Sequence, residues 1–95
     1  MTDEQLLAAV KTDKQISVSA YDTRLQEIIA SAKQAITAEG AQTLDPSASA
    51  EDAQLVVMYA GWLWESRNAP DAAMPRSLRW KLNNRIFGEK ARTTT

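Results

Sequence analysis

The sequence predicts an all-α protein, a small bundle of about four helices with two longer central helices and a basic C-terminal helix. Only three Gly and three Pro occur; Gly40, Pro46 and Pro70 fall between segments whose apolar residues recur at helical spacing, and Pro75 stands at the start of one. The length of 95 residues suits a single domain, and 44% hydrophobic residues allow a modest core. We place one helical domain at residues 1–90, followed by a flexible tail at 91–95.

The first helix is expected at about residues 3–12. Thr2 and Gln5 have the spacing of a capping box, and acidic residues follow the cap, where they favour the positive end of the helix dipole. The next segment, residues 13–20, is open to two interpretations. Its apolar residues alternate with polar ones, which is also typical of a short extended piece.

The second helix is expected at about residues 19–39, and Ser17 or Ser19 is expected to cap it. Seven residues fall within about 120° of arc on a helical wheel. They are Tyr21, Leu25, Ile28, Ile29, Ala32, Ala35 and Ile36. Gly40 is well placed to end the helix, because glycine adopts positive φ without strain.

The third helix is expected at about residues 49–67, and the sequence "SAED" at its start is a second candidate capping box. Its main apolar arc comprises Leu55, Val56, Tyr59, Ala60, Trp62 and Leu63. Val57 and Trp64 lie outside this arc, seven residues apart and nearly aligned. Two interpretations stay open for them: a second core face within the chain, or a contact between subunits.

The fourth helix is expected at about residues 75–90, opening at Pro75, a favoured first helical residue. Its narrow apolar stripe comprises Leu78, Leu82 and Ile86. Trp80 and Phe87 lie on the opposite side. Trp and Arg are enriched in binding hot spots, so this side is the best candidate for a partner contact. The candidate residues are Arg76, Arg79, Trp80, Asn83 and Phe87.

Charge is distributed unevenly along the chain. Residues 1–74 hold five Lys and Arg against eleven Asp and Glu, a net −6, whereas residues 75–95 hold six against one, a net +5. An acidic body with a basic end permits charge complementarity between subunits. It equally permits phosphate contacts, so a small nucleic-acid-binding or regulatory module that uses the basic helix is the alternative function.

No catalytic set is expected. The chain contains no His and no Cys, which removes the commonest general base and the thiolate metal ligands. Neighbouring Glu51 and Asp52 are better explained by a helix N-terminus than by acid–base chemistry. We therefore expect a protein that is not an enzyme and that has no cofactor and no metal. The longest apolar run, residues 55–64, is about half a membrane span, so no membrane association is expected.

One stretch is distinctive beyond its helical pattern. Leu63-Trp64-Glu65-Ser66-Arg67-Asn68 is followed by a loop, then by a helix that opens at Pro75 and carries Leu78 and Leu82. This arrangement resembles the phage head–tail connector family, the head-completion or adaptor proteins that dock beneath the portal. The similarity covers most of residues 3–87.

The resemblance implies a structural role in virion assembly. Subunits of this family form a ring with the symmetry of the portal, and the ring is expected to be dodecameric. It extends the DNA channel from the portal to a downstream tail or stopper protein. It implies a virion location at the head–tail interface, reached from the host cytoplasm, with DNA passing through without sequence-specific binding. Portal contacts are expected at the partner residues of the fourth helix. Subunit contacts are expected at Val57, Trp64, Glu65 and Arg67.

Overall fold

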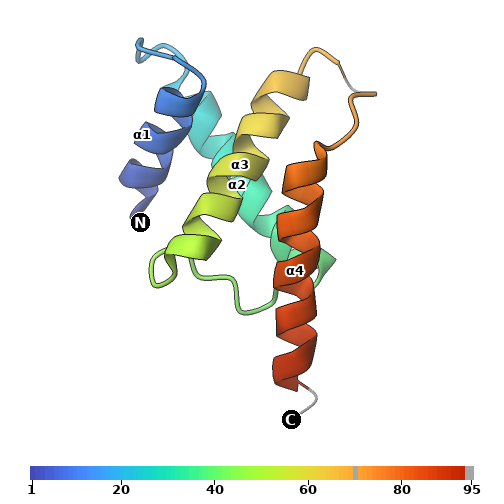
Figure 1. Ribbon diagram of the computed structural model, residues 1–95. Coiled ribbons are helices and arrows are strands. Elements are labelled where there is room, and N and C mark those ends of the chain that lie inside the picture. Colours follow the sequence, from blue (N-terminus) through green and yellow to red (C-terminus); the bar gives the residue numbers. More distant parts are fainter. Residues whose placement is uncertain (70, 94–95) are drawn as a thin grey trace.

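The protein is an all-α bundle of four helices in the computed structural model, which describes residues 1–69 and 71–93 (Figure 1). The helices are α1 (Asp3–Asp13), α2 (Asp22–Glu39), α3 (Ala50–Ser66) and α4 (Arg76–Thr93). The predicted fold class is confirmed, and the described residues contain no strand. None of the helices in this part of the chain combines the length and the apolar character that crossing a bilayer requires.

Helix α1 begins as its sequence predicts. The hydroxyl of Thr2 accepts a hydrogen bond from the backbone N–H of Gln5, and the Gln5 side chain accepts one from the N–H of Thr2. This reciprocal capping box satisfies two backbone donors that the first turn leaves open. Leu6 and Val10, four residues apart, then bury their side chains completely in the core.

Helix α2 begins at Asp22, about three residues later than predicted. Tyr21 is the N-cap residue and no side chain caps the helix, so the expectation that Ser17 or Ser19 would do so is wrong. The Ser19 carbonyl instead accepts a hydrogen bond from the N–H of Asp22 in a turn. Lys11 on α1 forms an ion pair with Asp22 at 2.7 Å, which joins the end of one helix to the start of the next. The segment before α2 contains no strand: turns or bends at residues 14–15 and 19–21 flank residues 16–18, which have no regular secondary structure.

Most of the apolar side predicted for α2 forms the core. The buried residues are Leu25, Ile28, Ile29, Ala32 and Ile36, and Ala35 is partly buried. Tyr21, by contrast, is 47% exposed. Gly40 ends the helix at φ 137°, as its position predicts, and its N–H bonds back to the last turn. A Cβ at this position would lie only 3.0 Å from Ile86 on α4, so glycine also permits the close approach of α4.

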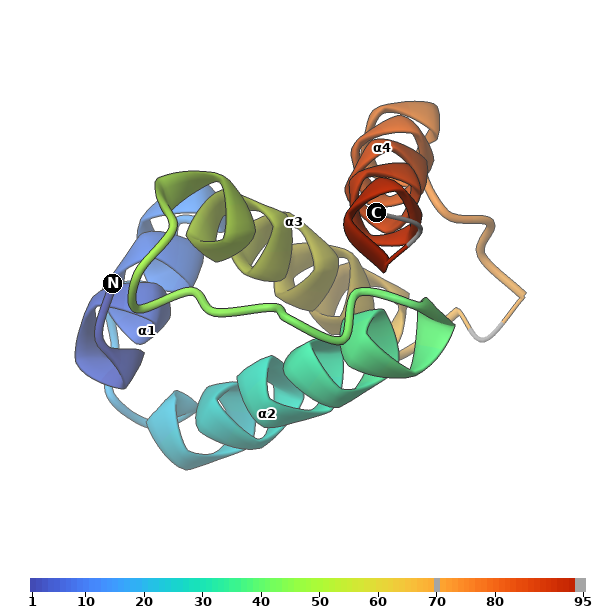
Figure 2. The same cartoon turned by 90° about the horizontal axis from the view of Figure 1, so that it is seen from below.

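Helix α3 is the central element. Figure 1 shows α3 between α1 and α4 with α2 behind it, and Figure 2 shows α1, α2 and α3 grouped with α4 alongside. Ser49 caps α3 by accepting a hydrogen bond from the N–H of Asp52. The reciprocal bond of a capping box does not form, because the Asp52 carboxylate is directed to Asp45 and to α4. Residues are buried on several sides of α3, in agreement with its broadly apolar sequence.

Helix α4 packs against α3 and continues through Thr93, three residues beyond the predicted end. Residues 91–93 are therefore helical rather than part of a tail, and residues 94–95 lie outside the described part. Leu78 and Leu82 are almost fully buried and Ile86 is partly buried against the core, which confirms the predicted stripe. The C-terminal end of α4 projects beyond the other helices (Figure 1).

Candidate functional site

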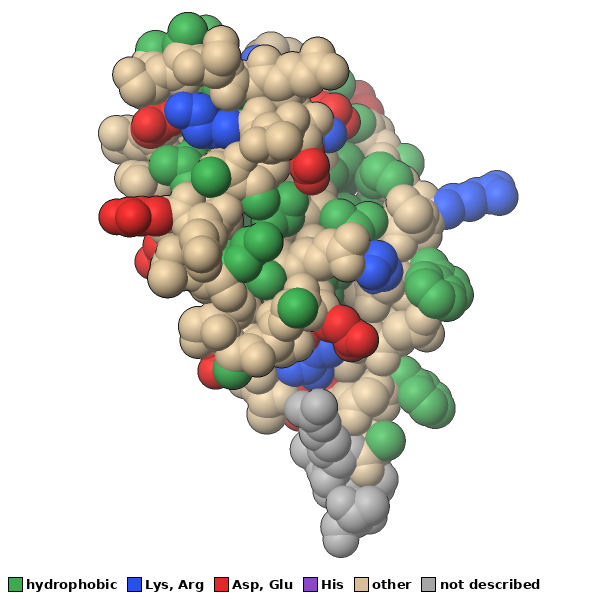
Figure 3. Space-filling view, turned by 60° about the vertical axis from the view of Figure 1, so that its left-hand side comes forward, with side chains coloured by type: hydrophobic (Ala, Val, Ile, Leu, Met, Phe, Trp, Pro, Cys, Tyr) green, Lys and Arg blue, Asp and Glu red, His purple; other side chains and the backbone are tan. Residues whose placement is uncertain are grey.

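The outward face of α4 carries the two aromatic side chains with the highest exposed fractions among the described residues. The inward leucine stripe fixes the rotation of the helix, and residues on the opposite side then point to solvent. Trp80 is 67% exposed and Phe87 is 75% exposed. Hydrophobic side chains stand clear of the surface along the right-hand edge of Figure 3. The structure thus gives these aromatic residues no core role.

The polar residues predicted beside them lie on the exposed sides of the same helix. Arg76 and Asn83 are exposed. Arg79 is half-exposed and its guanidinium lies 3.7 Å from the carboxylate of Glu39 at the end of α2. Together with Trp80 and Phe87, all five predicted partner-contact residues are therefore displayed by one helix. We call this set the α4 outer face, defined by Arg76, Arg79, Trp80, Asn83 and Phe87.

The structure buries Val57 and Trp64 inside the single chain. Val57 is 6% exposed and Trp64 is 8% exposed. The Trp64 ring makes an edge-to-face contact with Tyr21, with ring centroids 5.3 Å apart. This is the arrangement expected if both faces of α3 belong to the core of the chain. Little of either side chain is left to contact a neighbouring subunit.

The charged residues at the end of α3 also contact their own fold. Glu65 accepts a 2.6 Å hydrogen bond from the ammonium group of Lys14, the C-cap residue that follows α1. The Arg67 guanidinium lies over the Trp64 ring at 3.6 Å from the centroid and donates a hydrogen bond to the Trp64 carbonyl. Stacking on the ring and binding a carbonyl near the helix end are both favourable for a cation. The two residues remain exposed on their outer sides.

A buried polar cluster on the inner side of α4 was not predicted. Arg85 donates from Nε to the Asp52 carboxylate at 2.8 Å and from a second nitrogen at 3.4 Å, and it also lies 3.4 Å from Glu89. Glu89 accepts hydrogen bonds from the N–H and the hydroxyl of Thr43, each at 2.7 Å. The cluster therefore joins α3, α4 and the loop at residues 40–49. The spacing of four residues between Arg85 and Glu89 is the sequence signal that could have indicated part of it.

Hydrogen bonding shifts the pKa values of two groups in this cluster, Arg85 and Glu89. The bond to Asp52 raises the pKa of the Arg85 guanidinium above its usual value, with a smaller contribution from Glu89. The hydrogen bonds from Thr43, its backbone N–H above all, hold the pKa of Glu89 below its usual value. All of these groups are satisfied by one another, which is typical of a structural cluster.

Acidic side chains are the residues in the described part of the chain that could hold a metal ion. Among them, no group of three or more acidic side chains is placed to hold a metal ion, and the whole chain lacks His and Cys.

Comparison of the sequence and the fold with family models, curated proteins and solved structures found no match. The candidate site is the α4 outer face, which exposes the aromatic side chains of Trp80 and Phe87.

Proposed function

We propose that this protein is a phage head–tail connector subunit that docks on the portal protein through the α4 outer face. The observation that carries the proposal is the exposure of Trp80 and Phe87 on one side of a helix whose other side is anchored in the core. Exposed aromatic side chains beside arginines are typical of interaction hot spots. The resemblance of residues 63–68 and the following helix to connector proteins supplies the identity of the partner.

The rest of the proposed role follows from the same resemblance. Copies of the subunit assemble into a ring, expected to be dodecameric, which extends the DNA channel from the portal to the next tail or stopper protein. Because Val57 and Trp64 are occupied within the chain, contacts between copies would use the outer sides of Glu65 and Arg67. The proposal places the protein at the head–tail interface of the virion.

The helix that carries the α4 outer face is held to the body of the protein, which favours a docking role. Three independent contacts hold α4 to the body: the leucine stripe, the Arg85–Asp52 pair and the Arg79–Glu39 pair. A preformed surface loses little conformational freedom on binding. The aromatic pair can therefore contribute most of its buried area to affinity.

The alternative of a nucleic-acid-binding module loses support from the pairing of its basic residues. Arg85 is directed inward to carboxylates, and Arg79 lies beside Glu39. Duplex DNA binding depends on cations that are free to replace counterions at phosphates. Basic residues that already neutralise carboxylates contribute less to such binding.

The experiment that tests the proposal is the mass of the protein in solution, alone and with purified portal protein from the same phage, measured by sedimentation velocity. We expect a complex with portal, whether the free protein is a monomer or a ring. Trp80→Ala and Phe87→Ala should each weaken docking by roughly 30-fold, the effect of losing a hot-spot residue, without changing the helical circular dichroism signal. Val18→Ala, which removes an exposed apolar side chain away from α4, is the matched control and should dock normally.

Two results would overturn the proposal. One is a protein that stays monomeric and does not bind portal under any tested condition. The other is tight binding to free duplex DNA, with an affinity that falls steeply as salt rises, since that result supports the nucleic-acid alternative.

A further inference from the structure

The contact between α4 and the body of the protein changes character toward the C-terminal end of the helix. The inward stripe runs through Leu78, Leu82 and Ile86, and the next inward member at helical spacing is Glu89. Of residues 87–91, whose side chains the structure describes, only Glu89 is buried, at 4% exposed. The attachment is therefore apolar as far as Ile86 and polar at Glu89.

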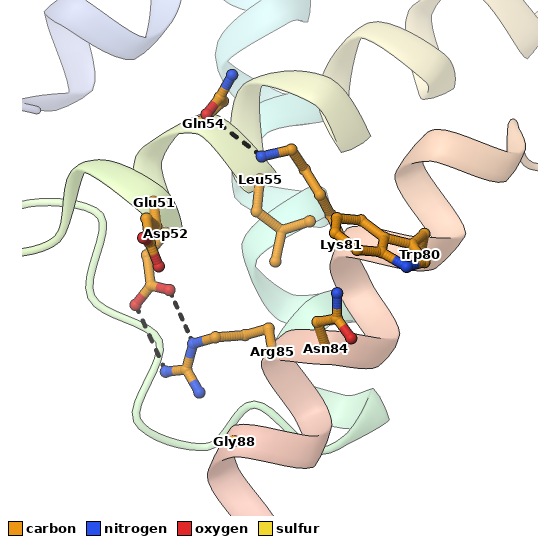
Figure 4. A pocket seen from close by; sticks show the side chains of 9 residues that line it. All are labelled: Glu51, Asp52, Gln54, Leu55, Trp80, Lys81, Asn84, Arg85 and Gly88. Carbon is orange, nitrogen blue, oxygen red and sulfur yellow. Dashed lines mark hydrogen bonds and ion pairs between the residues drawn. The ribbon is translucent and has the colours of Figure 1, made fainter.

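The Glu89 carboxylate is held from two directions. It accepts hydrogen bonds from the backbone N–H and the hydroxyl of Thr43, each at 2.7 Å, so it joins α4 to the loop at residues 40–49. Arg85, one turn earlier on α4, lies 3.4 Å away. Arg85 is itself fixed, because its guanidinium reaches from α4 to Asp52 near the start of α3 (Figure 4). Glu89 thus lies between the loop and a cation whose position depends on α3.

The turns that follow Ile86 have little helical stability of their own. Residues 87–93 make up about two turns, and isolated helices shorter than about 12 residues are marginal in water. They include Gly88, and glycine is among the poorest helix formers. Phe87 is 75% exposed and adds little packing against the body. The helical order of these turns therefore depends on contacts such as that of Glu89.

The negative charge of Glu89 strengthens this contact. The hydrogen bonds from Thr43, its backbone N–H above all, hold the pKa of the Glu89 carboxyl below its usual value. The stabilisation is therefore present above the usual value of 4.5 and is lost as the pH falls through the lower folded-state pKa. Protonation also removes the ion pair with Arg85.

Other charged groups lie on the elements next to this contact. Three of the carboxylates have partners: Asp52 on α3 with Arg85, Asp45 in the loop with Ser47, and Glu39 at the end of α2 with Arg79. Glu51 on α3 is exposed and has no ion pair in the described part of the chain, and Lys90 on α4 is exposed next to Glu89. When Glu89 is protonated, Arg85 keeps its pair with Asp52, which holds the first part of α4 in place.

We propose that Glu89 is a charge-dependent clamp that keeps the last two turns of α4 helical, and that loss of its charge releases these turns while the rest of the bundle stays folded. The leucine stripe packs without Glu89 and keeps the first part of the helix in place. Phe87 belongs to the released turns, so the clamp controls whether the α4 outer face presents both of its aromatic side chains on a helix. The inference concerns the single chain and does not depend on the identity of a partner.

The order of residues 87–91 can be measured by NMR from the carbon-13 chemical shifts of their Cα atoms. At pH ~7, Glu89→Ala should reduce the helical part of these shifts by roughly half or more, although alanine is the better helix former. Thr43→Val removes the hydroxyl from the loop side without changing α4, and it should shift them in the same direction. Asn84→Ala, at an exposed position of the same helix, is the matched control and should leave them unchanged.

Acidification tests the dependence on charge. Between pH ~7 and pH ~3, the helical shifts of residues 87–91 should fall in step with the titration of the Glu89 carboxyl carbon, before those of residues 25–36 change. Glu89→Ala should show no such step. The inference is overturned if Glu89→Ala is as helical at residues 87–91 as the unaltered protein. It is also overturned if these residues lose their helix only together with residues 25–36. Both measurements use the protein alone, so their outcome is independent of the docking experiment.

Discussion

Replacing Arg85 with methionine should destabilise the protein by about 3 kcal/mol. Methionine keeps much of the apolar stem but removes the guanidinium, which donates to Asp52 at 2.8 and 3.4 Å and to the Thr43 hydroxyl at 3.0 Å. Asp52 is 5% exposed and would keep only the hydrogen bond from the N–H of Asp45. Removing one partner of a buried pair costs about 3–5 kcal/mol. We expect the lower end because the Arg85 side chain is 15% exposed, so water can replace part of the loss.

Urea unfolding followed by circular dichroism measures this loss. For a domain of this size, 3 kcal/mol corresponds to a decrease of roughly 12–24 °C in melting temperature. Arg79→Met is the matched control on the same helix. Arg79 lies 3.7 Å from Glu39 and both side chains are more than a third exposed, so its loss should cost no more than about 1 kcal/mol.

A double-mutant cycle assigns the loss to the pair. Arg85→Met, Asp52→Ala and the double variant should give a coupling energy of about 1–3 kcal/mol. The reasoning is refuted if Arg85→Met is no more destabilising than Arg79→Met. It is also refuted if the coupling energy is below about 0.5 kcal/mol, because the two side chains would then act independently.

Three further predictions concern stability. Trp64→Ala should cost about 3–5 kcal/mol in urea unfolding, and an unchanged stability would contradict its burial in the core. Gly40→Ala should cost about 1–3 kcal/mol, measured by thermal melting, because of the positive φ and the close approach of Ile86, and a melting temperature at or above that of the unaltered protein would contradict this. The lowered pKa of Glu89 means that its stabilisation is present above its usual value of 4.5 and is lost as the pH falls through the folded-state pKa. Glu89→Gln should therefore be less stable than the unaltered protein near pH ~7, and the difference should shrink on acidification to pH ~3; a constant difference would argue against the shift.

The helices themselves were largely predictable, because they follow from local apolar periodicity and from glycine and capping residues. The start of α2 was not. Two serines preceded it, and side-chain capping by either was a reasonable local expectation. The structure begins the helix at Asp22, where the Lys11 ion pair and a backbone turn from Ser19 determine the geometry. An ion pair between residues eleven apart depends on how α1 and α2 meet, which local sequence patterns do not contain.

The tryptophans show what a helical wheel can and cannot decide. The wheel separated Trp64 and Trp80 from the main apolar arcs of their helices and left both open to a core or a partner role. Tyr21, which lies outside the helix that carries Trp64, and Arg67, which caps the C-terminal end of that helix, cover Trp64 in the structure. Trp80 has no such cover and is 67% exposed. The position of a residue on its helix was therefore predictable, and the identity of the groups that cover it required the tertiary structure.

The number of basic residues in the last helix was also predictable from the sequence, but their ion-pair partners were not. The difference bears on function. The net +5 of residues 75–95 is a sum over sequence, whereas a partner responds only to the charges that remain available on the surface. Arg85 forms ion pairs with Asp52 and Glu89, and Arg79 lies beside Glu39. Arg76 and Lys81 have no carboxylate at ion-pair distance among the described residues, and both lie on or beside the face that carries Trp80. The basic residues of α4 that have no ion pair, Arg76 and Lys81, thus lie next to the exposed aromatic side chains. This combination supports the proposed docking on a protein partner rather than on the uniform phosphate backbone of DNA.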